Sequence, residues 1–294
     1  TDVRTMALQG DTLWIGALNG LYTYQLQNRK LSPLGTKRNG LPHNTIYSII
    51  RTGDNQIYVG TYNGLCRYIA SNGKFEKIPL PVNSSQSNLF VNSLLEDTGR
   101  QCIWIGTEGY LFQYFPSTGQ MKQTEAFHNN SIKSLALDGN GYLLAGTDNG
   151  LYVYHNDVTP LQHIIHDSRN IQSLTNNIIW NIFADQEHNI WLGTDYGISL
   201  SRYNSALQFI PISQITGTGD GNQFYSLFRD SKGFYWFGGT NGLIRFTDPA
   251  GDKHNAIWYR MGDKTYPLSH NRIRHIYEDK EQQLWIATDG SINR

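Results

Sequence analysis

The strongest constraint on this chain is a short phrase that recurs seven times along its 294 residues. The first copy is Leu13-Trp14-Ile15-Gly16, and every later copy keeps three apolar or aromatic residues before a glycine, which becomes alanine only at Ala287. The copies are about 40 to 50 residues apart, a period typical of propeller blades and helical arrays. A chain with this repeat is expected to fold as a series of similar units that bury their apolar faces against one another.

The residues between the copies favour strands over helices. In the second repeat, short apolar-rich runs cover residues 45–51, 56–61, 65–69 and 75–80. Turn sequences such as Asn63-Gly64 and Asn72-Gly73 separate them, and these residues supply the positive φ angles that tight hairpin turns need. Four short strands per repeat are typical of a propeller blade. We therefore predict an all-β, seven-bladed β-propeller of four-stranded antiparallel blades in one domain, residues 1–294.

The blades are expected at residues 1–38, 39–83, 84–127, 128–170, 171–216, 217–266 and 267–294. The seventh repeat contains two strands before the sequence ends at Arg294, so we expect this blade to be incomplete and to lack its outer strands. Because the sequence begins at Thr1 without a methionine, we also expect it to be a piece of a longer protein. The connections between blades are long and variable, and such loops on a rigid scaffold are where binding usually resides.

Composition argues against several functional classes. Twenty-four basic residues balance 24 acidic ones, so the bulk charge gives no reason to expect contact with nucleic acid or an anionic membrane. The sequence has no apolar run approaching the length of a membrane-spanning helix. Cys66 and Cys102 occupy different positions in their repeats and have no CxxC partner, which argues against a metal or redox site. They could form one bridge or remain two buried thiols.

Two residue types recur in register, and packing and turn formation explain both. Tryptophan stands two residues before the motif glycine or its alanine in five repeats, which indicates packing between blades. Aspartate stands eight residues before the same position in four repeats, where its side chain can bond a hairpin turn. These residues are Trp14, Trp104, Trp191, Trp236, Trp285, Asp138, Asp185, Asp230 and Asp279. No nucleophile elbow, phosphate loop, dinucleotide fingerprint or metal-binding histidine spacing occurs, so we predict no catalytic residue, metal or cofactor.

Three longer phrases carry a family resemblance. Residues 39–46 (Asn-Gly-Leu-Pro-His-Asn-Thr-Ile), 173–178 and 268–273 each lead into the next copy of the motif. They resemble the two-component regulator propeller repeat, which builds the periplasmic sensor region of hybrid two-component systems in Bacteroidetes. The resemblance implies an oligosaccharide ligand, a second propeller and an immunoglobulin-like domain in the same protein, a homodimer, and a membrane-anchored histidine kinase with a DNA-binding regulator outside this piece. It implies no nucleic-acid contact by this domain.

One position of the expected first strands does not repeat. The second place of this strand is always apolar and the fourth is small or polar in nearly every blade, as at Ile46 and Ser48. The third place has no common size or charge. Its residues are Arg4, Tyr47, Asn92, Lys133, Trp180, Tyr225 and Arg274. Since a core position should be uniform, we predict that these residues line the mouth of the central channel and bind ligand. Rings can stack on sugar faces, while Arg and Lys donate hydrogen bonds.

Loop residues expected on the same face form a weaker set of ligand contacts. They are Lys37, Arg38, His43, Tyr62, Arg169, Tyr196, Tyr266 and Arg272. Each could equally be ordinary exposed surface, and the third-place residues could line a water-filled funnel or contact a partner domain. The sequence thus predicts a non-enzymatic sensor that binds an oligosaccharide and relays to a transmembrane kinase. The alternatives are a propeller glycan lyase or hydrolase and a protein-interaction scaffold.

Overall fold

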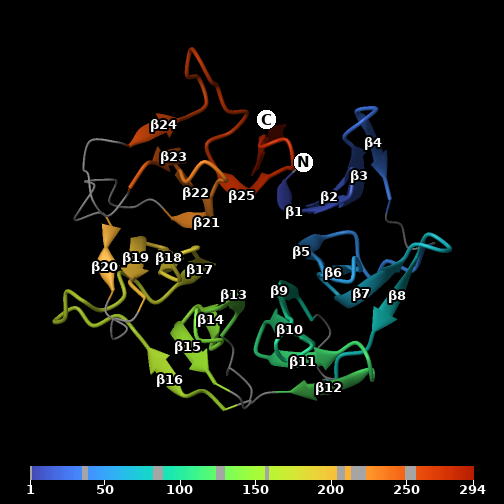
Figure 1. Ribbon diagram of the computed structural model, residues 1–294, viewed down its shortest axis with the longest axis horizontal. Helices are drawn as coiled ribbons and strands as arrows, with labels where there is room; N and C mark the ends of the chain where they lie inside the picture. Colours follow the sequence, from blue (N-terminus) through green and yellow to red (C-terminus); the bar gives the residue numbers. More distant parts are fainter. Residues whose placement is uncertain are drawn as a thin grey trace. The chain divides into compact units, whose positions relative to one another are not determined.

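Within the residues that the structure describes, the protein folds into seven antiparallel β-sheets, six with four strands and one with three (Figure 1). The structure, a computed structural model, describes residues 2–34, 39–81, 89–123, 130–155, 159–203, 209–212, 223–248 and 256–294. Each sheet contains strands that are consecutive in the sequence and hydrogen-bonded in that order, which is the arrangement of a propeller blade. The predicted all-β fold with seven propeller blades is therefore confirmed.

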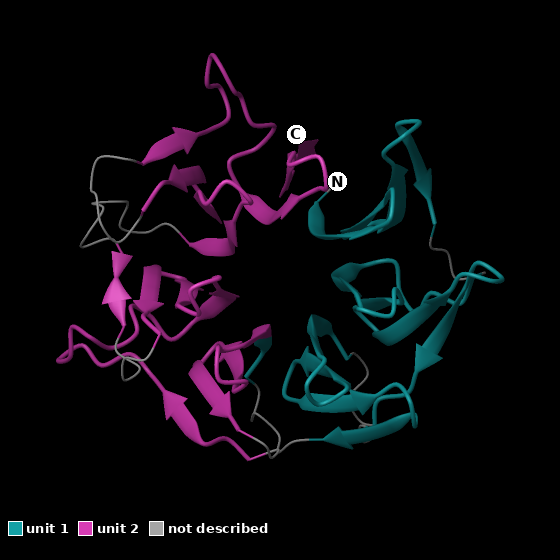
Figure 2. Cartoon of the chain, viewed as in Figure 1, with its two compact units in different colours: residues 1–132 teal, residues 133–294 magenta. Residues whose placement is uncertain are grey.

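The blades belong to two compact units (Figure 2). Unit 1, residues 1–132, contains blades 1 to 3, and unit 2, residues 133–294, contains blades 4 to 7. The strands of blades 1 to 3 are β1 (Val3–Gln9), β2 (Thr12–Ala17), β3 (Gly20–Gln25), β4 (Lys30–Pro33), β5 (Ile46–Arg51), β6 (Ile57–Thr61), β7 (Gly64–Ile69), β8 (Lys74–Ile78), β9 (Val91–Asp97), β10 (Cys102–Thr107), β11 (Leu111–Phe115) and β12 (Gln120–Gln123).

The first strand of blade 4 begins at the boundary between the units. The strands of blades 4 to 7 are β13 (Ile132–Leu137), β14 (Leu143–Thr147), β15 (Gly150–Tyr154), β16 (Gln162–Ile164), β17 (Ile179–Ala184), β18 (Ile190–Thr194), β19 (Gly197–Ser201), β20 (Ile210–Pro211), β21 (Phe224–Arg229), β22 (Tyr235–Gly239), β23 (Gly242–Phe246), β24 (Ile257–Tyr259), β25 (Ile273–Glu278), β26 (Leu284–Thr288) and β27 (Ile292–Asn293).

The second strand of each blade carries the repeated phrase because it is buried on both faces. Every residue of β6, β10, β14, β18 and β22 is buried. A strand buried in this way needs a continuous apolar run rather than an alternating pattern. The turn after β6 is closed by Thr61, whose hydroxyl donates to the Gly64 carbonyl oxygen at 2.9 Å. Gly64 has φ 101°, so the hairpin expected at Asn63-Gly64 is confirmed.

The motif glycine makes room for the next blade. A Cβ atom on Gly16 would lie 2.6 Å from Ile46 Cγ2, and one on Gly146 would lie 2.6 Å from Ile179 Cγ2. Both isoleucines occupy the second place of the following first strand and are completely buried. The glycine therefore repeats because the apolar second place of its neighbour repeats.

The motif tryptophan is held by a hydrogen bond that we call the indole latch. Trp191 Nε1 donates to Asp185 Oδ2 at 2.8 Å, while Asp185 Oδ1 accepts the N–H of Asn189 in the hairpin turn. The latch recurs as Trp104 to Asp97 at 3.0 Å, Trp236 to Asp230 at 2.8 Å, Trp285 to Asp279 at 2.7 Å and, with an amide acceptor, Trp14 to Gln9 at 3.1 Å. All five tryptophans are at most 8% exposed. Packing by tryptophan and turn formation by aspartate are both confirmed. The same aspartate bonds the turn through one oxygen and the indole through the other.

Blades 2 and 4 have no motif tryptophan. Blade 2 has Tyr58 at the tryptophan position and Thr52 at the aspartate position, whereas blade 4 has Leu144 opposite a retained Asp138. The latch therefore cannot form in these two blades.

Fourth-place side chains link neighbouring first strands in unit 2. Ser134 Oγ accepts the Ile182 N–H at 3.0 Å, Asn181 Oδ1 accepts the Leu227 N–H at 3.2 Å, and Ser226 Oγ accepts the Ile276 N–H at 3.1 Å. In blade 7 the fourth place is His275, whose Nδ1 atom is buried and has no hydrogen-bond partner among the described residues. Burial lowers the pKa of His275 to about 4, so its imidazole is neutral at pH 7.

Blade 7 is more complete than the sequence indicated. Its third strand, β27, pairs with β26 through Asn293 opposite Ile286 and Ile292 opposite Ala287. The expectation that both outer strands are lost was therefore wrong for the third strand. The turn before β27 explains how so short a strand forms, because the Thr288 hydroxyl donates to the Ser291 carbonyl oxygen at 2.8 Å.

The two cysteines are separate buried thiols. Cys66 and Cys102 are both free, and burial raises the pKa of each. This resolves the choice that the sequence left open, in favour of two thiols. Within the described residues, no helix has the length and apolar character needed to span a membrane.

Candidate functional site

In six blades the third place of the first strand is the extra residue of a β-bulge. In β5, Ile46 pairs with Thr61 and Ser48 pairs with Gly60, so Tyr47 between them is skipped. The same shift occurs in β1, β9, β17, β21 and β25. A bulged residue lies outside the regular ladder, and bulges re-aim side chains. This explains why the third place varies while its neighbours repeat; all seven third-place residues are partly exposed.

In unit 2 the four third-place side chains form one continuous row, which we call the third-place row. Lys133 Nζ lies 4.3 Å from the centre of the Trp180 ring. The Trp180 and Tyr225 rings meet edge to face with their centres 5.1 Å apart, and the Arg274 guanidinium lies 5.0 Å from the centre of the Tyr225 ring. The order cation, ring, ring, cation gives each ring a favourable partner. The row contains one residue from each of β13, β17, β21 and β25.

Three aspartates, each two residues after the motif glycine or alanine, anchor this row. Asp148 accepts from Lys133 Nζ at 2.8 Å, Asp195 accepts from Trp180 Nε1 at 2.9 Å, and Asp289 accepts from Arg274 Nε at 2.6 Å. Sequence reasoning missed these aspartates, although the signal was present. Each stands two residues after the motif glycine or alanine in a Thr-Asp pair, so the same alignment of repeats could have found them.

The remaining contacts of the row leave its charge balanced. The Tyr225 hydroxyl donates to Gln223 Oε1, and burial raises the pKa of Tyr225 although Arg274 and Arg272 act to lower it. Arg272, one of the weaker loop candidates, lies 3.5 Å from Asp289. Together with Arg272, the row and its anchors therefore contain three cations and three carboxylates. Such a surface suits hydrogen bonding to neutral polar groups.

The third-place residues of unit 1 have different neighbours. The Tyr47 and Tyr62 rings pack on Phe90 with centres 6.0 and 4.2 Å away, and the His43 ring packs on Tyr62 at 4.9 Å. This cluster brings two loop candidates, His43 and Tyr62, to a third-place residue. Phe90 was missed because it comes directly before β9, where the repeats share no residue type.

The other two third-place residues of unit 1 are Asn92 and Arg4. Asn92 Nδ2 donates to Ser131 Oγ at 2.9 Å. Burial raises the pKa of Tyr47, and the charge of Arg4 acts in the opposite direction, which shows that Arg4 is close enough to Tyr47 to interact electrostatically.

Three loop candidates have their contacts elsewhere. The Arg169 side chain is 90% exposed and pairs with Asp167. Tyr196 is 53% exposed, and Tyr266, 69% exposed, packs against Tyr259 with ring centres 6.2 Å apart. Lys37 and Arg38 lie outside the described residues. The structure therefore leaves Arg272, His43 and Tyr62 as the loop candidates that adjoin third-place residues.

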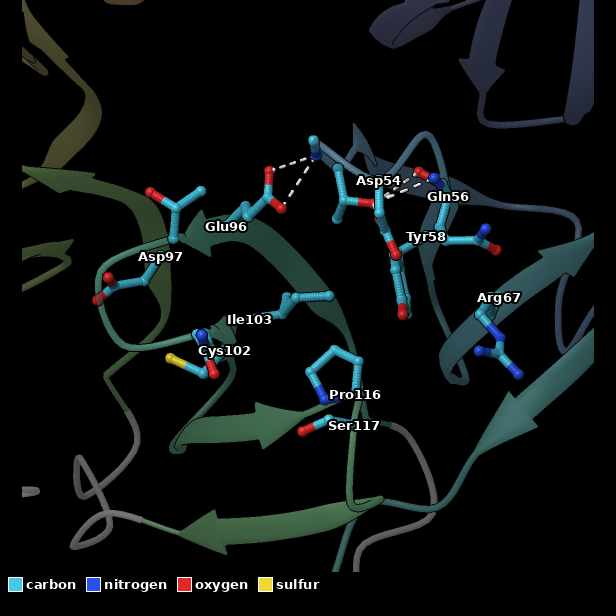
Figure 3. Close-up of a pocket in the computed structure, with 14 residues that line it drawn as sticks. Asp54, Gln56, Tyr58, Arg67, Glu96, Asp97, Cys102, Ile103, Pro116 and Ser117 are labelled. Atoms are coloured by element: carbon cyan, nitrogen blue, oxygen red, sulfur yellow. Dashed lines mark hydrogen bonds between the residues drawn. The ribbon is translucent and has the colours of Figure 1, made fainter.

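A separate groove of about 680 Å³ lies between blades 2 and 3 of unit 1. Figure 3 shows Tyr58 and Arg67 of blade 2 on one side and Cys102, Ile103 and Pro116 of blade 3 on the other. Glu96 bridges the blades, because its carboxylate accepts the N–H of Gly53 at 2.8 and 3.0 Å. The sequence did not predict this groove. Within the described residues there is no group of three or more His, Cys, Asp or Glu side chains suited to a metal ion.

A latch, a hairpin and a bulge that recur from blade to blade define a propeller built from one sequence repeat. Four segments of the chain, residues 40–63, 173–196, 218–241 and 267–290, match the family model of the two component regulator propeller. Two solved structures from B. thetaiotaomicron are 92% identical to the chain and are described as extracellular domains, one of a one component system and one of a hybrid two component system. These four segments of the chain therefore belong to the two component regulator propeller family.

The chain covers a different share of each relative. It is covered completely by both extracellular domains with a TM-score of 0.68, and it spans 40% and 39% of them. A protein named histidine kinase P4 from Formosa agariphila is 27% identical over an alignment of 278 residues, and the alignment covers 86% of this chain and 19% of that protein. Virginiamycin B lyase from Staphylococcus aureus, 14% identical with a TM-score of 0.69, covers 99% of this chain and is itself covered to 93%. At that identity the lyase shows the fold alone.

Proposed function

We propose that this chain is the ligand-sensing propeller of a periplasmic hybrid two-component sensor and that it binds an oligosaccharide at the third-place row. Family membership and the two extracellular relatives support the sensor role and agree with the periplasmic location. The proposed site depends on one observation. Third-place side chains from four blades make a continuous row of rings and cations, all partly exposed.

The row offers both kinds of contact that a sugar uses. Trp180 and Tyr225 provide ring surface for the apolar face of a sugar, and the flanking cations and carboxylates provide donors and acceptors for its hydroxyl groups. The balanced charge favours a neutral oligosaccharide over a polyanionic one, because each cation already has a carboxylate partner. The anchors also hold the side chains in place, which lowers the entropy cost of binding.

Ligand binding at this row would require one local rearrangement. Lys133 Nζ lies over the Trp180 ring at 4.3 Å, so a sugar stacked on that face must displace the ammonium group. Asp148, 2.8 Å from Nζ, can retain the displaced lysine. Binding is therefore coupled to a side-chain movement at the junction of β13 and β17.

The same geometry suggests how binding could produce a signal. A ligand changes a conformational equilibrium only if it binds one arrangement better than another. A ligand that contacts residues from four blades favours the arrangement in which all four contacts are made. In the full protein, a second propeller, an immunoglobulin-like domain and a homodimer would transmit this preference to the histidine kinase.

The test is calorimetry of the complete extracellular region with a panel of neutral and acidic oligosaccharides, with product formation followed in parallel. For the glycan that binds, Trp180→Ala and Tyr225→Ala should each weaken affinity about tenfold or more, as loss of a central aromatic contact does. Trp258→Ala is the matched control, since Trp258 lies on the fourth strand of blade 6 and contacts Arg260 instead. Wild-type affinity in both row variants would refute the site, and product formation would establish an enzyme instead.

A further inference from the structure

Unit 2 contains a second groove between adjacent blades, distinct from the third-place row. It lies between blades 4 and 5 beside the hairpin turns and has a volume of about 220 Å³. Its floor includes Leu144 and Ile190, which are 1% and 4% exposed. Three rings, those of Tyr142, His188 and Tyr203, stand around it with partial or full exposure. The groove is thus apolar at its base, and its lining combines these rings with polar side chains that include Gln162 and Arg202.

The neighbouring pair of blades shows what usually fills this space. Between blades 5 and 6 the indole of Trp191 packs against the Tyr235 ring, with centres 5.0 Å apart. Leu144 and Ile190 occupy the equivalent positions between blades 4 and 5, at the same distances from their motif glycines. Two large rings are replaced there by two smaller aliphatic side chains. The groove is therefore the space that an indole occupies elsewhere in the same unit.

The hydrogen-bond acceptor for that indole is retained. Asp138 Oδ1 accepts the N–H groups of Asn140 and Tyr142 at 2.9 and 2.7 Å and so forms the usual turn. In blade 5 the second oxygen of the equivalent aspartate accepts the indole N–H of Trp191. Asp138 Oδ2 accepts no hydrogen bond from the described part of the chain, and Asp138 lines the groove. The groove therefore has a carboxylate oxygen at the point where an indole donor would arrive.

The rim depends on a glycine. A Cβ atom on Gly139 would lie 2.7 Å from His188 Cβ and 2.9 Å from Tyr203 Cε2. The His188 and Tyr203 rings are 5.1 Å apart, centre to centre. Because Gly139 has no side chain, both rings can lie against the turn and form one wall of the groove.

We propose that the groove between blades 4 and 5 binds a small planar ring compound with an N–H or O–H donor on its edge, for which indole is the model. The ring would lie above Leu144 and Ile190 at the base of the groove, its face would contact the rim rings, and its donor would reach Asp138 Oδ2. The volume lies just below the range of about 300 to 1,000 Å³ typical of sites for drug-sized ligands. The groove thus suits one or two fused rings and is too small for an oligosaccharide.

This site is independent of the proposed sensor site. It shares no residue with the third-place row, and its chemistry rests on the absent tryptophan of blade 4. A second ligand at this position would bridge blades 4 and 5 in the way that the indole latch and its packing bridge blades 5 and 6.

The test uses indole as the probe and the intact chain as the protein, with binding followed by ligand-observed NMR. We expect saturable binding to the wild type. In Asp138→Asn, Oδ1 still holds the turn but an NH₂ donor replaces Oδ2, so affinity should fall about tenfold or more, as for loss of a hydrogen bond to a charged group. In Leu144→Trp the new side chain fills the groove, so indole binding should disappear while the melting temperature rises.

Two controls make the result specific. Naphthalene, a ring of similar size without a donor, should bind the wild type about tenfold more weakly than indole. Its affinity for Asp138→Asn should equal its affinity for the wild type. Asp185→Asn makes the same change in blade 5, where Trp191 already occupies the groove, and should leave indole affinity unchanged. Absence of saturable binding to the wild type would overturn the proposal, as would equal binding to the wild type and to Leu144→Trp.

Discussion

The two grooves between blades occupy the same register of the repeat yet differ in size and character. The groove between blades 2 and 3 measures about 680 Å³ and the one between blades 4 and 5 about 220 Å³. Tyr58 in the first corresponds to Leu144 in the second, and Gln101 corresponds to His188, both with positive φ, 53° and 64°. In each groove, the first of the two blades lacks the motif tryptophan. Space between blades therefore opens where the indole latch is missing.

The side chains that line each groove determine what the groove can bind. In the larger groove Arg67 pairs with Glu76 at 2.7 Å, and the Glu96 carboxylate accepts the Gly53 N–H. The smaller groove has Val153 and Ala184 at the positions of Arg67 and Glu96. Arg67 and Glu96 of the larger groove thus already have partners, whereas the smaller groove combines an apolar floor with an available carboxylate oxygen. Volume alone is a poor guide to a binding site.

The largest effect on stability is expected for Trp191→Leu, which makes blade 5 resemble blade 4. The substitution should open a groove between blades 5 and 6 and lower the free energy of unfolding by about 2 to 3 kcal/mol, less than the about 3 to 5 kcal/mol of a Trp→Ala change because leucine fills part of the space. Urea unfolding of the intact chain measures the loss. A change below about 0.5 kcal/mol, typical of surface substitutions, would show that the latch is not what closes the groove.

An intermediate effect is expected from a matched pair of glycine substitutions at equivalent turns. Gly139→Ala should cost about 1 to 2 kcal/mol, because His188 Cβ, 2.7 Å from the added Cβ, is fixed to the backbone and the turn itself must shift. Gly53→Ala should be neutral within about 0.5 kcal/mol, since the nearest neighbour, Glu96 Oε1, lies 3.7 Å from the added Cβ. Thermal unfolding of both variants tests the contrast, and equal losses would contradict it.

The smallest effect is a pH dependence in the larger groove. Burial opposes ionisation of Asp97, but hydrogen bonds from Trp104 and Arg100 outweigh it and lower the pKa of the carboxyl group. Its folded-state pKa lies below the unfolded value of about 3.9. The stabilisation is therefore complete above the unfolded pKa and is lost as the pH falls through the folded pKa.

Urea unfolding of the wild type and of Asp97→Asn across the acid range measures this contribution. The stability difference between them should be constant from neutral pH to about pH 5 and should shrink below about pH 4. A difference that persists unchanged to pH 2 would show that the ionised carboxylate is not responsible.

The candidate site was only partly predictable. Alignment of the repeats identified the third place as the position that varies, and its role in ligand binding stays a prediction. The alignment did not reveal the bulge at Tyr47 and its equivalents, because a bulge depends on pairing with the next strand. It also did not reveal that Lys133 lies over Trp180, since that contact joins residues 47 positions apart in the sequence.

The sequence by itself determined the repeat, the strands and the hairpin turns. Apolar runs such as Ile57–Val59, the turn at Asn63-Gly64 and the turn aspartates act within one blade, and interactions over a few residues leave a local pattern. Tertiary structure alone decided the latch geometry, the third-place row and the two grooves. Replacement of tryptophan by Leu144 is visible in the sequence, but whether it leaves a space depends on Ile190 and Tyr203 of the next blade. Packing across blades sets that outcome, and it leaves no periodic signal in the chain.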